Sequence, residues 1–164
     1  MSLEVNLLFE IGIIHTNPLD LSTPVDAPTI QWQVNLTDGA GADQADQVWH
    51  DRRSVANGSP DDIDFEGGLV NAFGVTLNPA RVAVLAIRHV SGPGNLTIGN
   101  DGNALVLGFG AGSHTWTIRP GGWFIVTAPD SGGWGTTAGS ADILQLASSS
   151  GTVVYDIIAV MKSA

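Results

Sequence analysis

The sequence predicts an all-β protein: an antiparallel β-sandwich with an extended amino-terminal arm. Short apolar segments alternate along the chain with the period of two that is typical of strands. Glycine accounts for 21 of the 164 residues and charged residues for only 13%, a composition that favours many short strands joined by turns. The strands recur at intervals of about 8–12 residues without intervening helices, so we expect a sandwich, with jelly-roll connectivity.

The amino-terminal segment predicts a strand that serves as an arm. Its apolar residues are Leu3, Val5, Leu7, Leu8, Phe9, Ile11, Ile13 and Ile14. An apolar, edge-forming strand can add to the sheet of a neighbouring subunit, so these residues are candidates for an interface. Pro18, Pro24 and Pro28 follow, and they favour an extended connector over a helix. Residues 1–29 are therefore predicted to be arm and connector, and residues 30–164 the sandwich domain.

Residues 30–36 form the clearest single strand in the sequence. Their even positions are apolar and their odd positions carry amides. We expect the even face, including Trp32, to be buried in the core. A slip of one residue in register would expose that face at ~1.5–3 kcal/mol per large side chain.

The middle of the chain contains further predicted strands. Residues 38–47 indicate a loop, with a short helix over residues 42–49 as the alternative. Residues 48–55 and 62–66 flank Asn57-Gly58-Ser59-Pro60, which predicts a hairpin. Residues 81–90 are apolar on both faces and therefore predict a central strand. Shorter strands are expected at residues 95–98 and 103–107.

The carboxyl-terminal third carries the longest apolar runs. Residues 115–118 and 123–128 are separated by the turn segment Arg119-Pro120-Gly121-Gly122, since Pro fixes φ and Gly admits positive φ. We expect Trp116 and Trp123 to be core residues and residues 123–128 to form a central strand. In residues 152–162 every odd position is apolar, which predicts one fully buried face.

The net charge of −10 is confined to residues 1–66, which contain twelve of the sixteen acids and only Arg52 and Arg53 as cations. Such a surface repels nucleic-acid phosphates, so direct nucleic-acid binding is not expected. The chain contains no cysteine, which excludes disulfides and thiolate metal sites. No secretory signal is recognisable, and no apolar run approaches the ~20 residues that cross a bilayer, so no membrane association is expected.

Candidate chemistry is sparse, and we predict no catalytic, metal-binding or cofactor-binding residues and hence no enzyme. His15, His50, His89 and His114 are widely spaced, unlike the clustered ligands of zinc sites. The acids of residues 61–66 could hold calcium through oxygen ligands. Their alternation with Ile63 and Phe65 favours a strand that shows its carboxylates to solvent.

Trp134 lies in a glycine-rich loop, Ser131-Gly132-Gly133-Trp134-Gly135. A large ring in such a loop is exposed unless it packs on something. Three partners are open: its own fold, another protein, or a carbohydrate. Trp134 is therefore a second candidate interface residue.

From about Asn35 onward the sequence resembles a family of small virion structural proteins of tailed bacteriophages and prophages. The segments that carry the resemblance are LTDGAGADQAD (36–46), WHDRR (49–53), GGLVNAFG (67–74), RPGG (119–122), APD (128–130) followed by Gly133-Trp134, and TVVYDI (152–157).

The resemblance implies a capsid decoration protein that binds the outside of the head shell. Its expected partners are the major capsid protein and further copies of itself, as a trimer. It would be made in the bacterial cytoplasm and reside on the capsid surface. The alternative is a tail-tip or fibre-associated domain that binds a host glycan or surface protein through exposed aromatics such as Trp134.

Overall fold

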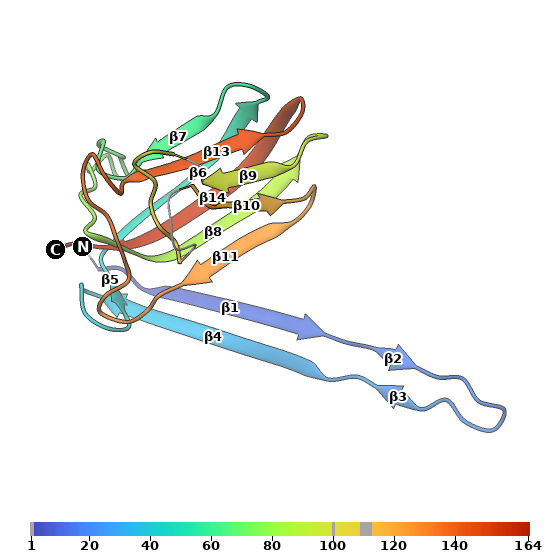
Figure 1. Ribbon diagram of the computed structural model, residues 1–164. Coiled ribbons are helices and arrows are strands. Elements are labelled where there is room, and N and C mark those ends of the chain that lie inside the picture. The colour runs from blue at the N-terminus through green and yellow to red at the C-terminus, as the bar shows by residue number, and fades with distance from the viewer. Residues whose placement is uncertain (1, 100, 109–112) are drawn as a thin grey trace.

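Two packed antiparallel sheets and a long projecting hairpin make up the computed structural model of the protein (Figure 1). The structure describes residues 2–99, 101–108 and 113–164, and within them every regular element is a strand. The predicted all-β class and antiparallel sandwich are confirmed. Jelly-roll connectivity stays a prediction.

The larger sheet is built around two long central strands. Its strand order is β11 (Trp123–Thr127), β8 (Arg81–Ser91), β14 (Thr152–Lys162) and β6 (Gln47–Ala56), and β12 (Trp134–Gly135) also pairs with β8. The central position predicted for residues 81–90 is confirmed, because β8 lies between β11 and β14.

The smaller sheet covers one face of the larger one. Its strand order is β10 (Thr115–Ile118), β9 (Leu96–Gly99), β13 (Ile143–Ser148) and β7 (Asp61–Asp64). The predicted strand at residues 103–107 is reduced to an isolated bridge between Ala104 and Ile143.

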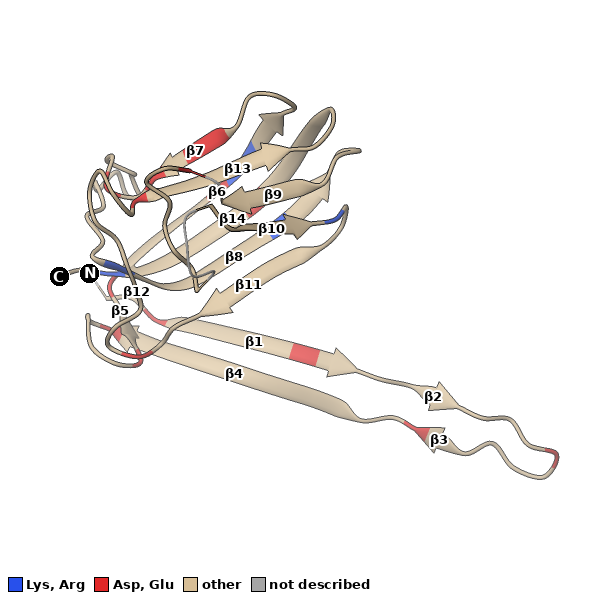
Figure 2. Ribbon diagram, in the orientation of Figure 1, with Lys and Arg blue, Asp and Glu red and all other residues tan. Residues whose placement is uncertain are grey.

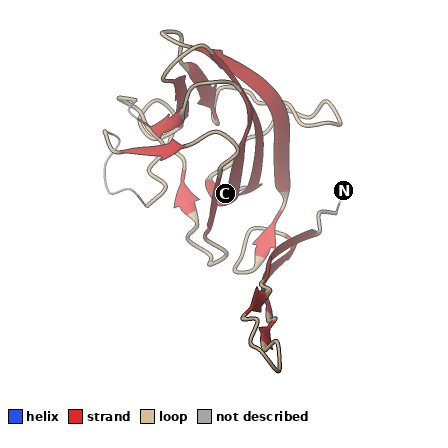
Figure 3. Ribbon diagram, turned by 90° about the vertical axis from the view of Figure 1, so that its right-hand side faces the viewer, coloured by secondary structure: helices blue, strands red, loops and turns tan. Residues whose placement is uncertain are grey.

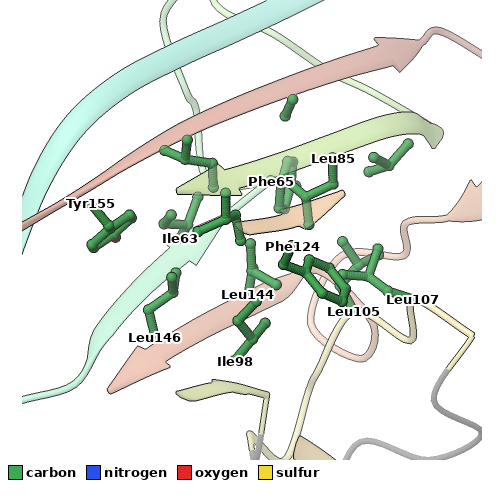
Figure 4. Packing of buried hydrophobic residues seen from close by; sticks show 14 of the residues in the cluster. Ile63, Phe65, Leu85, Ile98, Leu105, Leu107, Phe124, Leu144, Leu146 and Tyr155 are labelled. Atoms are coloured by element: carbon green, nitrogen blue, oxygen red, sulfur yellow. The ribbon is translucent and has the colours of Figure 1, made fainter. Parts of the chain in front are cut away.

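The main core lies between these two sheets, as Figure 4 shows. Strand β14 contributes its odd residues, which are all at most 1% exposed: Val153, Tyr155, Ile157, Ala159 and Met161. The fully apolar face predicted for this strand is thus its core face. Leu144 and Leu146 from β13 and Ile98 from β9 approach it from the smaller sheet.

The arm is a two-stranded ribbon made of β1 (Val5–Gly12) and β4 (Thr29–Asp38), extended by the short strands β2 (His15–Thr16) and β3 (Val25–Asp26). It leaves the sandwich and reaches well beyond it (Figures 1 and 3). The strand predicted at residues 30–36 is present, but it pairs with β1, so the arm runs to Asp38 instead of ending at residue 29. At its base, β5 (Gln44–Ala45) pairs in parallel with the end of β4, in place of the alternative helix.

Three tryptophans predicted to be core residues lie on the surface. Trp32, Trp116 and Trp123 are 61%, 52% and 61% exposed, and β11 stands at the end of its sheet rather than in the centre. Alternation identified correctly which side chains share a face. Trp32 and Trp123, however, lie on two outer surfaces that the described part of the chain covers only in part.

The segment after β6 forms a corner between the sheets instead of the predicted hairpin. Strand β6 pairs with β14 and strand β7 pairs with β13, so the chain changes layers between them. The change of layer lets Ile63 and Phe65 enter the core, where they are 2% and 0% exposed.

A polar cluster joins the two sheets at this corner. Arg53 in β6 donates two hydrogen bonds of 2.7 Å to the carboxylate of Asp61 in β7, and the Tyr155 hydroxyl in β14 donates a third of 2.7 Å. The Arg53 guanidinium holds the pKa of Asp61 below its ordinary value, with a smaller contribution from Tyr155, although burial opposes both. Burial and the neighbouring Asp61 raise the pKa of Tyr155.

We expect Asp61→Asn to lower the free energy of unfolding at neutral pH by about 1–3 kcal/mol. The amide cannot accept all of the hydrogen bonds that Arg53 and Tyr155 donate to the carboxylate. The folded pKa of Asp61 lies below its ordinary value of 3.8. Its contribution is therefore complete above that pH and is lost as the pH falls through the folded pKa. Urea unfolding of both proteins across the acid range measures the difference, which should shrink below about pH 4. Asp51→Asn, at an exposed contact of 3.4 Å with Arg53, is the control, and an equal effect there would contradict the assignment.

Candidate interaction surface

The arm has one apolar face and one polar face because of its register. The pairs Val5–Leu36, Leu7–Val34, Phe9–Trp32 and Ile11–Ile30 all lie on one side of the ribbon. We call these eight residues the arm stripe. The opposite face carries pairs such as Asn6–Asn35 and Glu10–Gln31. An antiparallel pair with this alternation is expected to rest its apolar face on another layer.

The base of the stripe rests on the sandwich. Leu36 is 1% exposed and forms a second apolar cluster with Val84 of β8 and Val160 of β14. Val5, Leu7 and Val34 pack against this cluster while they remain partly exposed. The proximal half of the stripe is therefore covered by the outer face of the larger sheet.

The distal half of the stripe is not covered by the described part of the chain. Phe9, Ile11, Ile30 and Trp32 are 45%, 37%, 39% and 61% exposed. The rings of Phe9 and Trp32 stack with their centroids 5.4 Å apart and their planes 5° from parallel. Stacking of this kind fixes both rings as one flat apolar plate.

A buried lysine fastens the arm base to the sandwich. Lys162, the last residue of β14, is 0% exposed, and its Nζ donates to the carbonyl oxygens of Gly41, Pro129 and Asp130 at 2.9, 3.1 and 2.6 Å. The Asp43 amide also donates to the Pro129 carbonyl, at 2.8 Å. The loop after β4 and the loop after β11 are thus held together through one ammonium group.

The outer face of the larger sheet continues beyond the arm base and is exposed there. Trp123 and Ile125 of β11 and Ile158 of β14 are 61%, 37% and 47% exposed. The register places Ile125 and Ile158 on either side of Ala86. We call these four residues the sheet patch.

The sheet patch has a charged border. The guanidinium of Arg88 lies 5.1 Å from the centre of the Trp123 ring, a favourable cation–π arrangement. Arg52 donates two hydrogen bonds, of 2.6 and 2.9 Å, to Asp156. Figure 2 shows that the acids of the arm have no basic residues among them.

A groove of about 290 Å³ separates the arm from β11 where the two diverge. Phe9 and Trp32 line it from the arm, and Ile125 and Thr127 line it from the sheet. Ligand pockets usually enclose roughly 300–1,000 Å³ with a few converging polar groups. This groove lies at the lower end of that range, and its walls are mainly apolar side chains.

The predicted interface residues divide into three groups. Phe9 and Ile11 belong to the exposed stripe, and Ile13 and Ile14 continue beyond it at 40% and 81% exposure. Leu3, Val5 and Leu7 pack on the chain's own sheet, whereas Leu8 points to the polar face opposite Gln33.

Trp134 is partly buried and packs against the main core. Its own fold therefore covers part of the ring, and a role of Trp134 in an interface stays a prediction.

Sequence reasoning missed the exposed half of β4 and the sheet patch. Ile30, Trp32, Trp123, Ile125 and Ile158 were assigned to strands, but the first four were expected to be covered by the same chain. The apolar character of both faces of residues 123–128 was the available signal. Apolar residues on both faces indicate that both faces of this strand are buried. The described part of the chain buries mainly the face toward the core.

The acidic run of residues 61–66 is engaged in structural contacts. Asp61 belongs to the cluster with Arg53, Asp64 accepts the Glu66 amide, and Glu66 accepts the Thr136 hydroxyl. No group of three or more His, Asp or Glu side chains suited to a metal ion occurs in the described part of the chain.

Comparisons of the chain with family models, with curated proteins and with solved structures find no match. Across residues 2–99, 101–108 and 113–164, no helix is long and apolar enough to cross a membrane. The surface geometry and the resemblance of the sequence segments are therefore the basis for a functional proposal.

We expect Lys162→Met to loosen the arm base and to lower the free energy of unfolding by about 1–3 kcal/mol, because buried carbonyl acceptors lose their donor. Amide exchange should accelerate at Thr37 and Asp43, whose amides donate to the Asp43 and Pro129 carbonyls. Hydrogen exchange read by NMR, together with urea unfolding, measures both effects. Arg119→Met removes the same charge from an exposed position and is the control. Unchanged exchange rates at both amides in Lys162→Met would contradict the role of Lys162 in holding the arm base.

Proposed function

We propose that this protein is a structural component of a repeating protein assembly, and specifically a decoration protein on the outside of a tailed-bacteriophage head shell. The observation that carries the proposal is the projecting arm, whose apolar face is covered at its base and uncovered beyond it. A sandwich domain with an exposed apolar ribbon of this kind has a surface suited to contacts with other proteins.

Energetics support an assembly partner for the arm. Isolated two-stranded hairpins are at best marginally stable in water. Full burial of a large apolar side chain contributes ~1.5–3 kcal/mol. The four exposed stripe side chains are only partly buried, so each contributes less than this in the isolated chain. A partner surface that covers them would stabilise the ribbon and the complex together.

The assignment to a virion rests on the resemblance, and two of the segments that carry it meet at the arm base. Residues 36–46 and 128–130 are joined there through Lys162 and through the Asp43 amide. Both segments help to hold the arm on the sandwich, which supports a role for the arm.

Charge supports a position outside the shell. The chain has a net charge of −10, which disfavours contact with packaged DNA. The proposed partners are the major capsid protein and further copies of the chain, with synthesis in the host cytoplasm. The proposed role is mechanical: each bound copy adds contact area that resists internal pressure. No reaction is proposed.

A tail-tip protein that binds a host glycan is the weaker alternative. It relied on exposed aromatics such as Trp134, and the Trp134 ring packs in part on the core. Trp123 is exposed, but Arg88 lies over one face of its ring, which leaves only the other face for stacking on a sugar.

Copy number in purified particles tests the proposal directly. A decoration protein covers a lattice, so gel densitometry against the major capsid protein should give hundreds of copies per particle. A dozen copies or fewer would place the protein in the tail or neck and would overturn the decoration assignment.

We also expect removal of the distal arm to reduce shell binding without unfolding the sandwich. Replacing residues 9–32 with Asn-Gly joins the paired residues Leu8 and Gln33 through a two-residue turn of the favoured kind. The base of the stripe and its cluster stay intact. Binding to shells that lack the protein should fall roughly tenfold or more, since multivalent attachment is lost. Leu21→Ser, at a fully exposed position at the arm tip, should bind as the unmodified protein does.

A further inference from the structure

Two exposed apolar surfaces on this chain match one another in chemistry. One is the distal half of the arm stripe, with Phe9 and Trp32 at its centre. The other is the sheet patch, with Ile125 and Ile158 at its centre. We infer that the distal arm of one copy packs on the sheet patch of a second copy.

The packing at the arm base shows what this contact looks like. There, Leu36 of the stripe lies against Val84 and Val160 on the outer face of the larger sheet. The next rows on the same face are Ile125–Ala86–Ile158 and Trp123–Arg88–Asp156. The proposed contact extends an existing ribbon-on-sheet interface along both surfaces.

The arm of the same copy does not make this contact. The ribbon diverges from β11 (Figure 1), and the groove between them is lined by Phe9 and Trp32 on one side and by Ile125 on the other. Both walls remain substantially exposed. The distal stripe and Ile125 of the same copy thus border one groove without closing it, and the inferred contact is completed by a second copy.

Charge favours a contact between arm and sheet over a contact between two arms. Residues 1–38 contain five acids and neither Lys nor Arg, so two arms repel one another. The sheet patch is bordered by Arg88 and Arg52, with Asp156 between them. With Asp156 paired to Arg52, this border carries one net positive charge, opposite in sign to the arm as a whole. Glu10 lies on the polar face of the ribbon, so the attraction acts between the arm and the sheet as a whole.

The apolar face of the ribbon allows packing of layers. Strand β1 pairs with β4 along one edge over Val5–Gly12, and it is an edge strand among the described strands. Addition of a strand to a neighbour at the other edge of β1 stays a prediction. The inferred contact uses the apolar face, which is a different surface from that edge.

The size of the contact predicts a weak, dissociable oligomer. A buried Phe or Trp side chain covers roughly 150–250 Å², and stable interfaces bury roughly 800 Å² on each partner, so the partly exposed side chains of the distal stripe supply less than a stable interface needs. Each copy can donate one arm and receive one. Each subunit can therefore take part in two such contacts.

This inference deepens the proposed function, but its test needs no shell. Sedimentation velocity of the purified full chain over a dilution series should show an oligomer that dissociates to monomer. Trp32→Ser on the arm and Ile158→Asp on the sheet patch should each raise the dissociation constant roughly tenfold or more. Leu21→Ser and Val70→Asp, at exposed positions outside both surfaces, should leave it unchanged. Thermal unfolding of each variant establishes that it is folded.

A mixture of the two interface variants makes the test specific. Trp32→Ser retains an intact patch and Ile158→Asp an intact arm, so the mixture should form a complex with one intact contact although neither variant associates alone. Association of Ile158→Asp at full strength would mean that arms pack on arms, and would overturn the inference. A chain that stays monomeric at its highest soluble concentration would also overturn it. Neither result bears on the copy number in particles, so the decoration proposal would stand or fall separately.

Discussion

The register of β1 against β4 is the constraint on which the rest of the molecule depends. It pairs Leu7 with Val34 and Phe9 with Trp32, and this parity places every member of the stripe on one face. A shift of one residue would interleave amides with the apolar side chains and destroy the face. A ribbon of two strands cannot cover that face by itself. The outer face of the larger sheet covers the base of this face, and the distal half stays exposed in the described structure.

Strand β14 connects the stability of the core with the orientation of the arm. Its odd residues, such as Tyr155, fill the space between the sheets, while Val160 faces outward against the arm base. The strand ends in Lys162, whose ammonium group holds the loop that follows the arm. A change that disturbs the core packing of β14 therefore also moves the platform from which the arm projects. This coupling lets a small domain hold a long ribbon in one direction.

The sequence was sufficient to predict the fold class and the strands with the strongest alternation. The period of two in residues 152–162 identified the core face of β14 correctly, because that face is apolar without exception. The same argument located the strand around Trp32 and the central strand around Val84. Glycine content and the absence of helical periodicity were enough to exclude helices from the prediction.

The layer that covers each apolar face could not be predicted. The alternation of the sequence shows that Trp32 and Trp123 each share a strand face with other apolar side chains. The sequence pattern is identical whether that face is buried by the same chain or by another molecule. Both faces of β11 are apolar. A strand that is buried on both sides within one chain has the same sequence pattern as an edge strand whose outer face lies in an interface. The cluster of Arg53, Asp61 and Tyr155 was missed for a related reason. Arg53 and Tyr155 are 102 positions apart in the sequence. The three residues meet because the chain changes layers between β6 and β7.

The chemistry of the arm explains how an exposed apolar ribbon can remain specific. Free strand edges invite pairing with unrelated chains, and charges and prolines near the edges reduce that hazard. The arm carries Glu4 and Glu10 in or beside β1, and Pro18, Pro24 and Pro28 in its distal part. These features oppose edge-to-edge pairing while they leave the apolar face unobstructed. The arm is thus suited to rest on a flat, weakly basic apolar surface, and the outer face of its own sheet is a surface of that kind.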